Sequence, residues 1–265
     1  MSRCRLAGTM VAMKAAGTAW ITPPGRLSLG FRDVHLWFVP AAPPDLAEKD
    51  LELLVSPAEQ DRSRMFARST DRRRYLSARG ALRKILAGYL QASPSSIAIS
   101  YSASGKPFLH GVSAPPGQLH FNVSHDADTA VVAVSNGLKV GVDVERIRAL
   151  PGRDEILADF FSGAEQDFVR SRGNGGDDAF FQVWTRREAS SKAVGTRLIE
   201  SFQRFSIPAM RYSPGGFPVR MPERAEEDAA AQEWWLRDFV PAPGHAGALC
   251  VEKENRAPAF WRFSW

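Results

Sequence analysis

Apolar residues follow two alternating patterns along the first half of the chain. Short, nearly continuous apolar runs predict buried strands, whereas an apolar residue at every third or fourth position predicts an amphipathic helix. Strands are predicted at residues 34–41, 97–100, 118–123, 129–135 and 140–145. A long helix is predicted at residues 71–89, with its apolar stripe at Tyr75, Ala78, Leu82, Ile85 and Leu86. Arg74 and Arg79 lie off that stripe.

Two shorter helices are expected before the long one. The first is predicted at residues 46–53. The second begins at Ser56-Pro57, because serine is a favourable N-cap and proline fits the first helical turn. It carries Arg62, Met65 and Phe66.

The second half repeats this plan and favours an α+β fold with two similar α/β lobes. Helices are predicted at residues 153–172 and 177–194, and strands at 204–207, 217–220, 233–240 and 247–251. SHDADTAVVAVS and VPAPGHAGALCVE occupy matching places in the two halves, each a polar turn that enters an apolar strand. Residues 33–146 and 147–265 are therefore predicted as two like lobes, joined near residues 146–152, with a binding cleft between them.

Composition is that of an ordinary globular protein. The chain has 265 residues, of which 44% are apolar and 24% charged, enough for one large core or two modest ones. Lysine and arginine exceed the acidic residues by five, and the excess is concentrated in residues 61–84. Such a cluster fits a solvated helix face, a nucleic-acid patch, or a site for a phosphorylated ligand or acidic partner.

The N-terminal segment and the cysteines suggest where the protein works. Cys4 and Cys250 form neither a disulfide framework nor a zinc spacing, so the reducing cytoplasm is the expected compartment. Residues 1–32 contain five basic and no acidic residues, and their apolar stretches are too broken for a signal peptide or a membrane span. This segment is predicted to be a flexible extension, or the product of a start codon placed too early.

The segment GVDVE carries the first candidate chemistry. Successive side chains of a strand alternate faces, so Asp143 and Glu145 point the same way while Val142 and Val144 point the other way. Neighbouring carboxylates repel unless a cation or a proton lies between them. A hard, oxygen-binding ion such as Mg²⁺ fits this pair.

A second segment, WTRREASSK, adds to this chemistry. On a helix, Trp184, Glu188 and Lys192 recur every four residues and form one stripe. The stripe offers a third carboxylate and an ammonium group. Three carboxylates and a lysine suggest metal-assisted phosphoryl chemistry, although each segment alone also fits a solvated acidic rim or a surface salt bridge.

Two other functions compete with this interpretation. A metal-dependent nuclease uses similar residues, but its lysine usually follows the acid by two positions on one strand. A basic nucleic-acid-binding protein could use the cluster of Arg72, Arg73 and Arg74. That function would leave three carboxylates without a role, and no RNA-binding or helix-turn-helix signature accompanies the cluster.

Five ordered segments resemble those of a known family. They are SGKPFL (Ser104 to Leu109), FNVSHD (Phe121 to Asp126), GVDVE (Gly141 to Glu145), FFSGAE (Phe160 to Glu165) and WTRREASSKAVGTRL (Trp184 to Leu198). Over residues 34–252 the chain resembles the larger, monomeric 4′-phosphopantetheinyl transferases that activate surfactin synthetase and related carrier proteins. The resemblance implies two lobes related by a pseudo-twofold axis, with coenzyme A and a metal ion between them. It implies a monomer with no nucleic-acid or membrane partner.

The resemblance also implies a reaction. The phosphopantetheine arm of coenzyme A would move to a serine hydroxyl of an apo acyl or peptidyl carrier protein, releasing 3′,5′-ADP. Asp143, Glu145 and Glu188 would bind Mg²⁺. Glu188, or a water on the metal, would take the serine proton, and Lys192 would place its charge on the scissile phosphate or protonate the leaving oxygen.

Further residues acquire expected roles from the same resemblance. His125, with Ser124, would contact a phosphate of coenzyme A, and Asn122 would shape the turn. The adenine and the 3′-phosphate would be bound by Lys106, Pro107, Arg62, Arg74 and Arg79. Glu59 stands where a basic residue is common, and Arg187 stands where a lysine is usual.

The carrier protein is expected to dock after the catalytic helix. Residues 196–205 would form this surface, with Leu198, Ile199 and Phe202 as apolar contacts. Carrier proteins are acidic around their serine, so Arg197 and Arg204 would assist docking. Trp184 is expected to anchor the catalytic helix in the core.

Overall fold

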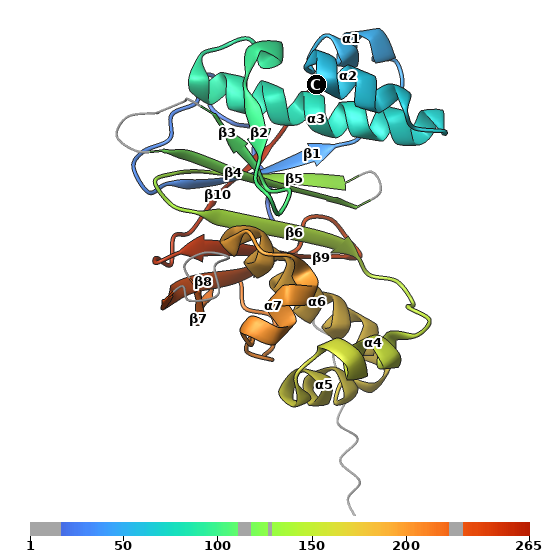
Figure 1. Cartoon of the computed structure of the whole chain (residues 1–265), viewed down its shortest axis with the longest axis vertical. Helices are drawn as coiled ribbons and strands as arrows, with labels where there is room; N and C mark the ends of the chain where they lie inside the picture. Colours follow the sequence, from blue (N-terminus) through green and yellow to red (C-terminus); the bar gives the residue numbers. More distant parts are fainter. Residues whose placement is uncertain (1–16, 111–117, 127–128, 223–229) are drawn as a thin grey trace, which may run out of the picture.

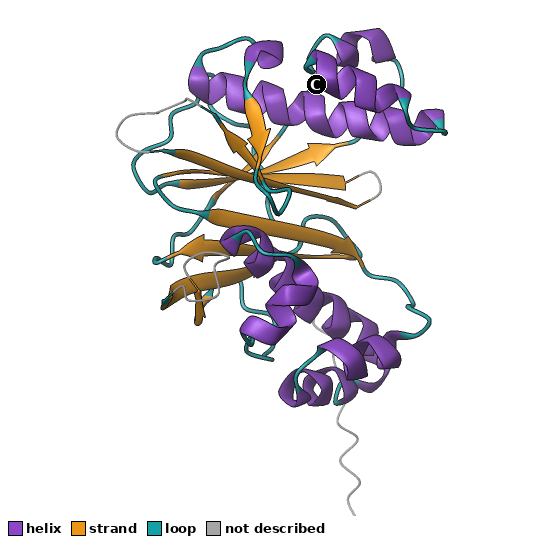
Figure 2. Ribbon diagram, in the orientation of Figure 1, coloured by secondary structure: helices purple, strands orange, loops and turns teal. Residues whose placement is uncertain are grey.

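Two four-stranded sheets pack face to face and carry helices on their outer sides (Figures 1 and 2). This computed structural model describes residues 17–110, 118–126, 129–222 and 230–265. It confirms the predicted mixed α+β fold. Among the described residues, no helix is both long and apolar enough to cross a membrane.

The first sheet has the strand order β10-β1-β5-β4. These strands span Ala259–Arg262, Val34–Pro40, Thr129–Asn136 and Leu119–Asp126. The helices α1, α2 and α3 cover its outer face (Figure 1) and span Glu48–Glu52, Pro57–Arg64 and Ser69–Leu90. A short 3₁₀ turn, η1 (Pro94–Ser96), leads to a two-stranded ribbon of β2 (Ile99–Tyr101) and β3 (Pro107–Leu109).

The second sheet has the strand order β6-β9-β8-β7. These strands span Val140–Arg146, His245–Glu252, Ala231–Phe239 and Phe217–Pro222. The helices of this half are α4 (Arg153–Phe160), α5 (Gly163–Arg170), α6 (Gly176–Val194) and α7 (Leu198–Arg204), with a 3₁₀ turn, η2 (Gly173–Gly175), before α6. Helix α6 packs on β6 and β9.

Strand β1 shows why its apolar run is continuous. Leu36 and Phe38 point into the core between the two sheets, where they meet Val142 of β6. Trp37 and Val39, which alternate with them, point into the core beneath α3. Both faces of the strand are buried, so neither face can be polar.

The sheets divide the chain differently from the two predicted lobes. β6 lies in the second sheet although the predicted first lobe extended to residue 146. β10, which the pattern did not predict, pairs in parallel with β1 of the first sheet. The last strand of the chain therefore completes the sheet of the first half.

The predicted helix at residues 153–172 is two helices. Ser162 interrupts it as an N-cap: its hydroxyl accepts a hydrogen bond from the Glu165 backbone N–H, and the Glu165 side chain accepts one from the Ser162 N–H. This reciprocal capping starts a new helix where the apolar period alone continued the old one.

The strand predicted at residues 204–207 is wrong. Phe205 and Ile207 alternate like residues of a strand, but they are buried in the core beneath α6, and no strand of the described residues pairs with them. Residues 198–204, just before them, form α7, which the apolar pattern did not predict.

Part of the predicted flexible extension is packed against both sheets. The Trp20 ring lies 5.6 Å from that of Phe38 in β1 and 6.2 Å from that of Phe239 in β8. Its indole N–H donates a hydrogen bond to the Pro241 carbonyl at 2.9 Å. Residues 17–32 thus differ from the prediction, whereas residues 1–16, including Cys4, lie outside the described residues.

Candidate active site

The open edge of β6 is covered by polar side chains of β4. Three alternate side chains of β4 accept hydrogen bonds from three alternate backbone N–H groups of β6. The pairs are Asn122 with Val142 (2.8 Å), Ser124 with Val144 (3.3 Å) and Asp126 with Arg146 (2.5 Å). These bonds satisfy the edge of the second sheet and join the two halves at the predicted site.

Asp143 lies at this junction and is 2% exposed. Its Oδ1 accepts hydrogen bonds from Ser124 Oγ at 2.7 Å and from Lys192 Nζ at 2.6 Å. Its Oδ2 is buried and has no hydrogen-bond partner among the described residues. Burial raises the pKa of Asp143 to about 6, although the Lys192 ammonium lowers it. A buried carboxylate with a free oxygen is suited to a further cation.

Two more carboxylates surround the same point. Burial, followed by the nearby charges of Asp143 and Asp126, raises the pKa of Glu145 to about 7. Glu188 Oε2 lies 3.5 Å from Lys192 Nζ, so the ammonium group contacts both Asp143 and Glu188. Burial alone would lower the pKa of Lys192, but these two carboxylates raise it above its ordinary value.

The donor set fits a hard divalent cation. Asp143, Glu145 and Glu188 supply carboxylate oxygens, and the unpaired Oδ2 of Asp143 shows that the site is not saturated by protein contacts. Within the described ranges, however, no three acidic, histidine or cysteine side chains are gathered as a ready-made metal cluster. The Lys192 ammonium currently bridges two of the three acids.

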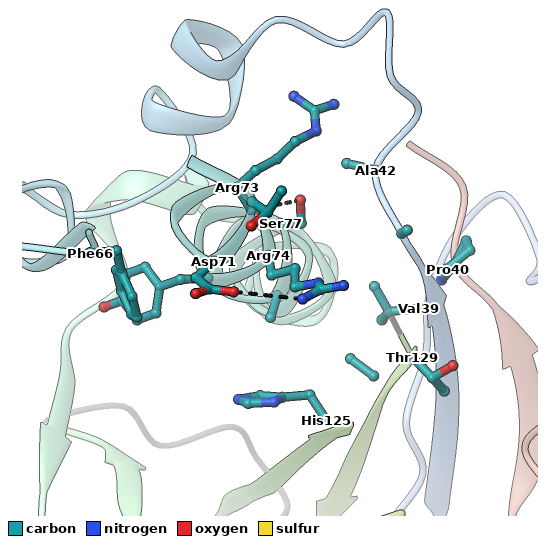
Figure 3. Close-up of a pocket in the computed structure, with 15 residues that line it drawn as sticks. Val39, Pro40, Ala42, Phe66, Asp71, Arg73, Arg74, Ser77, His125 and Thr129 are labelled. Atoms are coloured by element: carbon teal, nitrogen blue, oxygen red, sulfur yellow. Dashed lines mark hydrogen bonds and ion pairs between the residues drawn. The ribbon is translucent and has the colours of Figure 1, made fainter. Parts of the chain in front are cut away.

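A cavity of about 590 Å³ lies between α3, the end of β1 and the β4–β5 hairpin. Figure 3 shows the Arg74 guanidinium and the His125 ring at its border, with Arg74 directed from α3 and His125 from β4. Arg74 Nη1 lies 3.6 Å from Asp71 Oδ1, a loose ion pair. Burial and then the Lys192 charge lower the pKa of His125, so its imidazole is mainly neutral near pH 7.

Apolar groups form much of the remaining wall of this cavity. Phe66 and Tyr75 lie on one side, with ring centroids 5.3 Å apart, and Val39 and Ala130 line the sheet. A cationic rim and an aromatic wall suit a ligand with both a phosphate group and a flat ring.

The other residues expected to bind coenzyme A lie away from this cavity. Lys106 Nζ donates a hydrogen bond to the Ala193 carbonyl at 2.8 Å, and burial lowers the pKa of Lys106 to about 8. Its ammonium group therefore caps the end of α6 in this structure. Pro107 begins β3, and Arg62 is exposed on α2.

Arg79 is bound by Glu59, the acid that stands where a basic residue is common in the family that the chain resembles. Glu59 accepts hydrogen bonds from Arg79 Nε at 2.7 Å and Arg83 Nε at 2.5 Å, and it also caps α2 through Ser56. Arg79 contacts the Tyr101 hydroxyl as well. Glu59 therefore pairs with arginines of α3, at a position where a basic residue would be available to bind a phosphate.

Helix α6, which carries the expected catalytic residues, is anchored by Trp184 as predicted. The Trp184 ring packs against Phe180 and Phe161, with centroids 5.7 and 6.3 Å away. Arg187, next to Glu188, is buried and forms a two-point ion pair with Glu165 at 2.7 and 2.8 Å. These contacts fix the turn of α6 that presents Glu188.

Asp126 was not among the expected site residues. It accepts a hydrogen bond from the Arg146 N–H and contributes to the raised pKa of Glu145. The signal was present in FNVSHD, where Asn122, Ser124 and Asp126 alternate with other residues and so share one face of a strand.

Comparisons with known proteins match both halves of the chain. A family described as "4'-phosphopantetheinyl transferase, N-terminal" matches residues 46–137, and the "4'-phosphopantetheinyl transferase superfamily" matches residues 139–236. The 4'-phosphopantetheinyl transferase HetI of Nostoc sp. (strain PCC 7120 / SAG 25.82 / UTEX 2576) is 31% identical over 245 residues, covering 92% of this chain and 98% of that protein. The chain belongs to the 4′-phosphopantetheinyl transferases.

Further relatives agree with this assignment. The L-aminoadipate-semialdehyde dehydrogenase-phosphopantetheinyl transferase of Homo sapiens is 31% identical over 58% of this chain and 52% of its own length. The protein of the same name from Rattus norvegicus is 30% identical over 76% of this chain and 68% of its own length. The chain is therefore a transferase. These relatives do not support the nuclease or nucleic-acid-binding interpretations.

Proposed function

We propose that this phosphopantetheinyl transferase moves the phosphopantetheine arm of coenzyme A to a serine of an apo acyl or peptidyl carrier protein and releases 3′,5′-ADP. The observation that carries the proposal is the cluster of Asp143, Glu188 and Lys192 where β4 meets β6, in which Asp143 is buried and the other two side chains are partly exposed. The 590 Å³ cavity, bordered by Arg74 and His125, supplies a binding site for the nucleotide.

Mg²⁺ is the proposed metal, and Asp143, Glu145 and Glu188 are its proposed ligands. When bound, it would neutralise charge on the diphosphate of coenzyme A. The unpaired Oδ2 of Asp143 and the raised pKa of Glu145 support this role, since both side chains lack sufficient positive partners in the protein alone.

The other roles in the transfer, which are proton acceptance and charge stabilisation, are proposed for side chains of the cluster. The serine Oγ–P bond forms as the P–O bond to 3′,5′-ADP breaks, and the serine proton passes to the Glu188 carboxylate, directly or through water. Lys192 has a raised pKa and therefore stays protonated at neutral pH, which suits a fixed positive charge on the scissile phosphate. Ser124 and Asp143 hold its ammonium group in place.

The nucleotide end of coenzyme A is proposed to occupy the cavity beside α3. Arg74 would bind the 3′-phosphate through its planar guanidinium group, and His125 would contact a phosphate closer to the reacting bond. Arg62 on α2 and Arg79 on α3 do not line this cavity and stay candidates for the outer phosphate only. Lys106 is the least suitable, because its ammonium group is already bound to α6.

A pseudo-twofold relation of the two halves is part of the same proposal. The strand order β1-β5-β4 of the first sheet matches β6-β9-β8 of the second, with antiparallel pairs throughout. In both halves a long helix, α3 or α6, packs on the sheet. This likeness supports two related lobes with one active cluster at their junction.

One transfer assay tests the proposal. The enzyme is incubated with coenzyme A, Mg²⁺ and an apo carrier protein, and mass spectrometry follows the carrier. We expect the mass of one phosphopantetheine arm to appear on the carrier serine, and a carrier with that serine changed to alanine to stay unmodified. The proposal fails if neither an acyl nor a peptidyl carrier gains the arm while the enzyme is folded.

A further inference from the structure

Strand β6 and helix α6 approach each other most closely at Gly141. A Cβ atom placed on this residue would lie 2.1 Å from the carbonyl oxygen of Ala189 and 2.4 Å from the backbone nitrogen of Ala193. Both atoms belong to the backbone of α6, so no rotation of a side chain could make room. Only a residue without a Cβ atom permits this contact.

This contact lies next to the reacting groups. Gly141 shares one face of β6 with Asp143 and Glu145, because residues two apart on a strand point the same way. On α6, Ala189 and Ala193 directly follow Glu188 and Lys192. The backbone contact therefore lies within two residues along the chain of both partners of the 2.6 Å bond between Lys192 Nζ and Asp143 Oδ1.

The opposite face of β6 cannot move to compensate. Val140, Val142 and Val144 are at most 1% exposed and pack in the core between the two sheets. An added methyl group at position 141 would therefore displace α6 and not β6. Ordinary contact begins at 3.4 Å, so the helix backbone must withdraw by at least about 1.3 Å from the 2.1 Å contact. Such a shift exceeds the tolerance of a catalytic geometry.

We infer that Gly141 is a positioning residue, which sets the separation of β6 and α6 and so allows Glu188 and Lys192 to meet Asp143. The inference rests on the proposed function in taking Asp143, Glu145 and Glu188 as metal ligands. It adds that the small residue before these acids determines whether the third acid, on another element, can reach the same ion.

The nucleotide cavity offers an internal control. Its lining comes from β1, α3, the loops beside them and the β4–β5 hairpin, and it includes neither Gly141 nor any residue of α6. A change of the β6–α6 separation should therefore impair the chemical step and metal binding while leaving coenzyme A binding nearly intact.

The test compares Gly141→Ala with Gly163→Ala, because a Cβ at Gly163 meets no atom within 4 Å. Mn²⁺ binding is measured by electron paramagnetic resonance without substrate, together with kcat, the KM for coenzyme A, and thermal unfolding. For Gly141→Ala we expect Mn²⁺ affinity to fall at least about tenfold and kcat about 100-fold, with the KM changed less than about twofold. Gly163→Ala should match the wild type.

A second variant checks the distance directly. Asp143→Glu lengthens the side chain by one methylene group, about 1.5 Å. In the Gly141→Ala background this change should restore part of the Mn²⁺ affinity, whereas in the wild-type background it should lower the affinity. Equal losses in both backgrounds would contradict a role in spacing.

The outcomes separate this inference from the proposed function. A wild-type enzyme that neither binds Mn²⁺ nor transfers the arm overturns the proposed function. An active wild type with a Gly141→Ala variant equal to Gly163→Ala overturns the inference alone. A Gly141→Ala chain that does not fold also overturns it, since Gly141 would then serve folding and not positioning.

Discussion

Asp143 illustrates how burial and charge act together on one side chain. Its desolvation favours the neutral acid, while the Lys192 ammonium favours the carboxylate, and the resulting pKa of about 6 leaves the group mostly ionised at neutral pH. One oxygen accepts hydrogen bonds from two donors, and the other accepts none from the residues that the structure describes. This asymmetry is expected of a side chain that binds an additional ligand.

Replacing Asp143 by asparagine should therefore separate function from stability. Asp143→Asn keeps the shape and a hydrogen bond to Ser124 but loses the charge, so kcat should fall on the order of 100- to 1,000-fold. Kinetics at saturating coenzyme A and Mg²⁺, with thermal unfolding alongside, measure the two effects. Asp154→Asn, at an acid whose side chain is 68% exposed, serves as the control. Wild-type turnover by Asp143→Asn would contradict the proposed role of Asp143 as a metal ligand.

Arg74 offers a test of nucleotide recognition. Removing a hydrogen bond to a charged phosphate costs about 1.5–3 kcal/mol, so Arg74→Ala should raise the KM for coenzyme A roughly 10- to 100-fold. Dephospho-coenzyme A lacks the 3′-phosphate, and its KM should change little. Arg64→Ala, on the exposed side of α2, is the matched control. Equal losses for both substrates would show that Arg74 holds another part of the molecule.

Helix α7 shows how neighbouring residues of one element differ in role. Ile199 is 62% exposed, whereas the Phe202 ring lies 5.2 Å from that of Phe161 and beneath the Arg187 guanidinium. Phe202 therefore belongs to the core that supports α6. Of the three apolar residues expected to contact the carrier, Ile199 is the best placed to do so.

Two alanine variants of α7 should accordingly give opposite results. Ile199→Ala should raise the half-saturating concentration of carrier, by about 1 kcal/mol of binding energy, without a change in thermal stability. Phe202→Ala should lower the free energy of unfolding by about 2 kcal/mol, because the ring is only partly buried. The measurements are carrier titrations at saturating coenzyme A and chemical unfolding. A carrier dependence unaffected by Ile199→Ala would place docking elsewhere.

At the scale of the whole molecule, each half anchors its long helix through the same helix-capping motif and ion pair. Residues 56–64, SPAEQDRSR, and 162–170, SGAEQDFVR, are identical at six of nine positions. In each, the serine and glutamate cap a short helix, and the glutamate then pairs with an arginine of the long helix. The pairs are Glu59 with Arg83 and Glu165 with Arg187. This repeat is stronger support for related lobes than the strand similarity used to predict them.

Because of Glu59, the capping glutamate of the first half, the free energy of unfolding should fall as the pH is lowered into the acid range. Burial by itself would raise the pKa of Glu59, but the Ser56 N–H and the Arg79 and Arg83 guanidinium groups outweigh it and hold the pKa below its ordinary value. A lowered folded-state pKa gives stability that is present above the unfolded pKa, near 4.5, and is lost as pH falls through the folded value.

Unfolding by urea between pH 7 and pH 3 tests this dependence. Glu59→Gln should cost about 3 kcal/mol at pH 7, because it leaves the buried Arg83 without its counter-charge. The difference from the wild type should begin to shrink below about pH 4.5, where the unfolded chain gains a proton. It should be lost as pH falls through the lowered folded-state pKa, where the wild-type carboxylate is protonated too. Asp61→Asn, at an exposed acid of the same helix, should show no such dependence. A constant difference across the pH range would contradict the argument.

The local pattern of residues was sufficient to predict most elements and the residues of the proposed active site. Strand β6 could be predicted because its valines alternate with polar residues, and the same alternation placed Asp143 and Glu145 on one face. Helices α3 and α6 have clear periods, and the period of α6 placed Glu188 and Lys192 on one stripe. Each of these inferences uses only residues that are close along the chain.

Contacts between distant segments were decided by the tertiary structure alone. β10 pairs with β1 across more than 200 residues, and Trp20 packs on both sheets, although neither segment has a distinctive local pattern. Lys106 looks like a phosphate ligand in its motif, yet folding brings the end of α6 to its ammonium group. The sequence by itself determined which residues can do the chemistry, because side-chain type and local period are local properties. Only the fold decided which of them meet, because distances between elements depend on how the whole core packs.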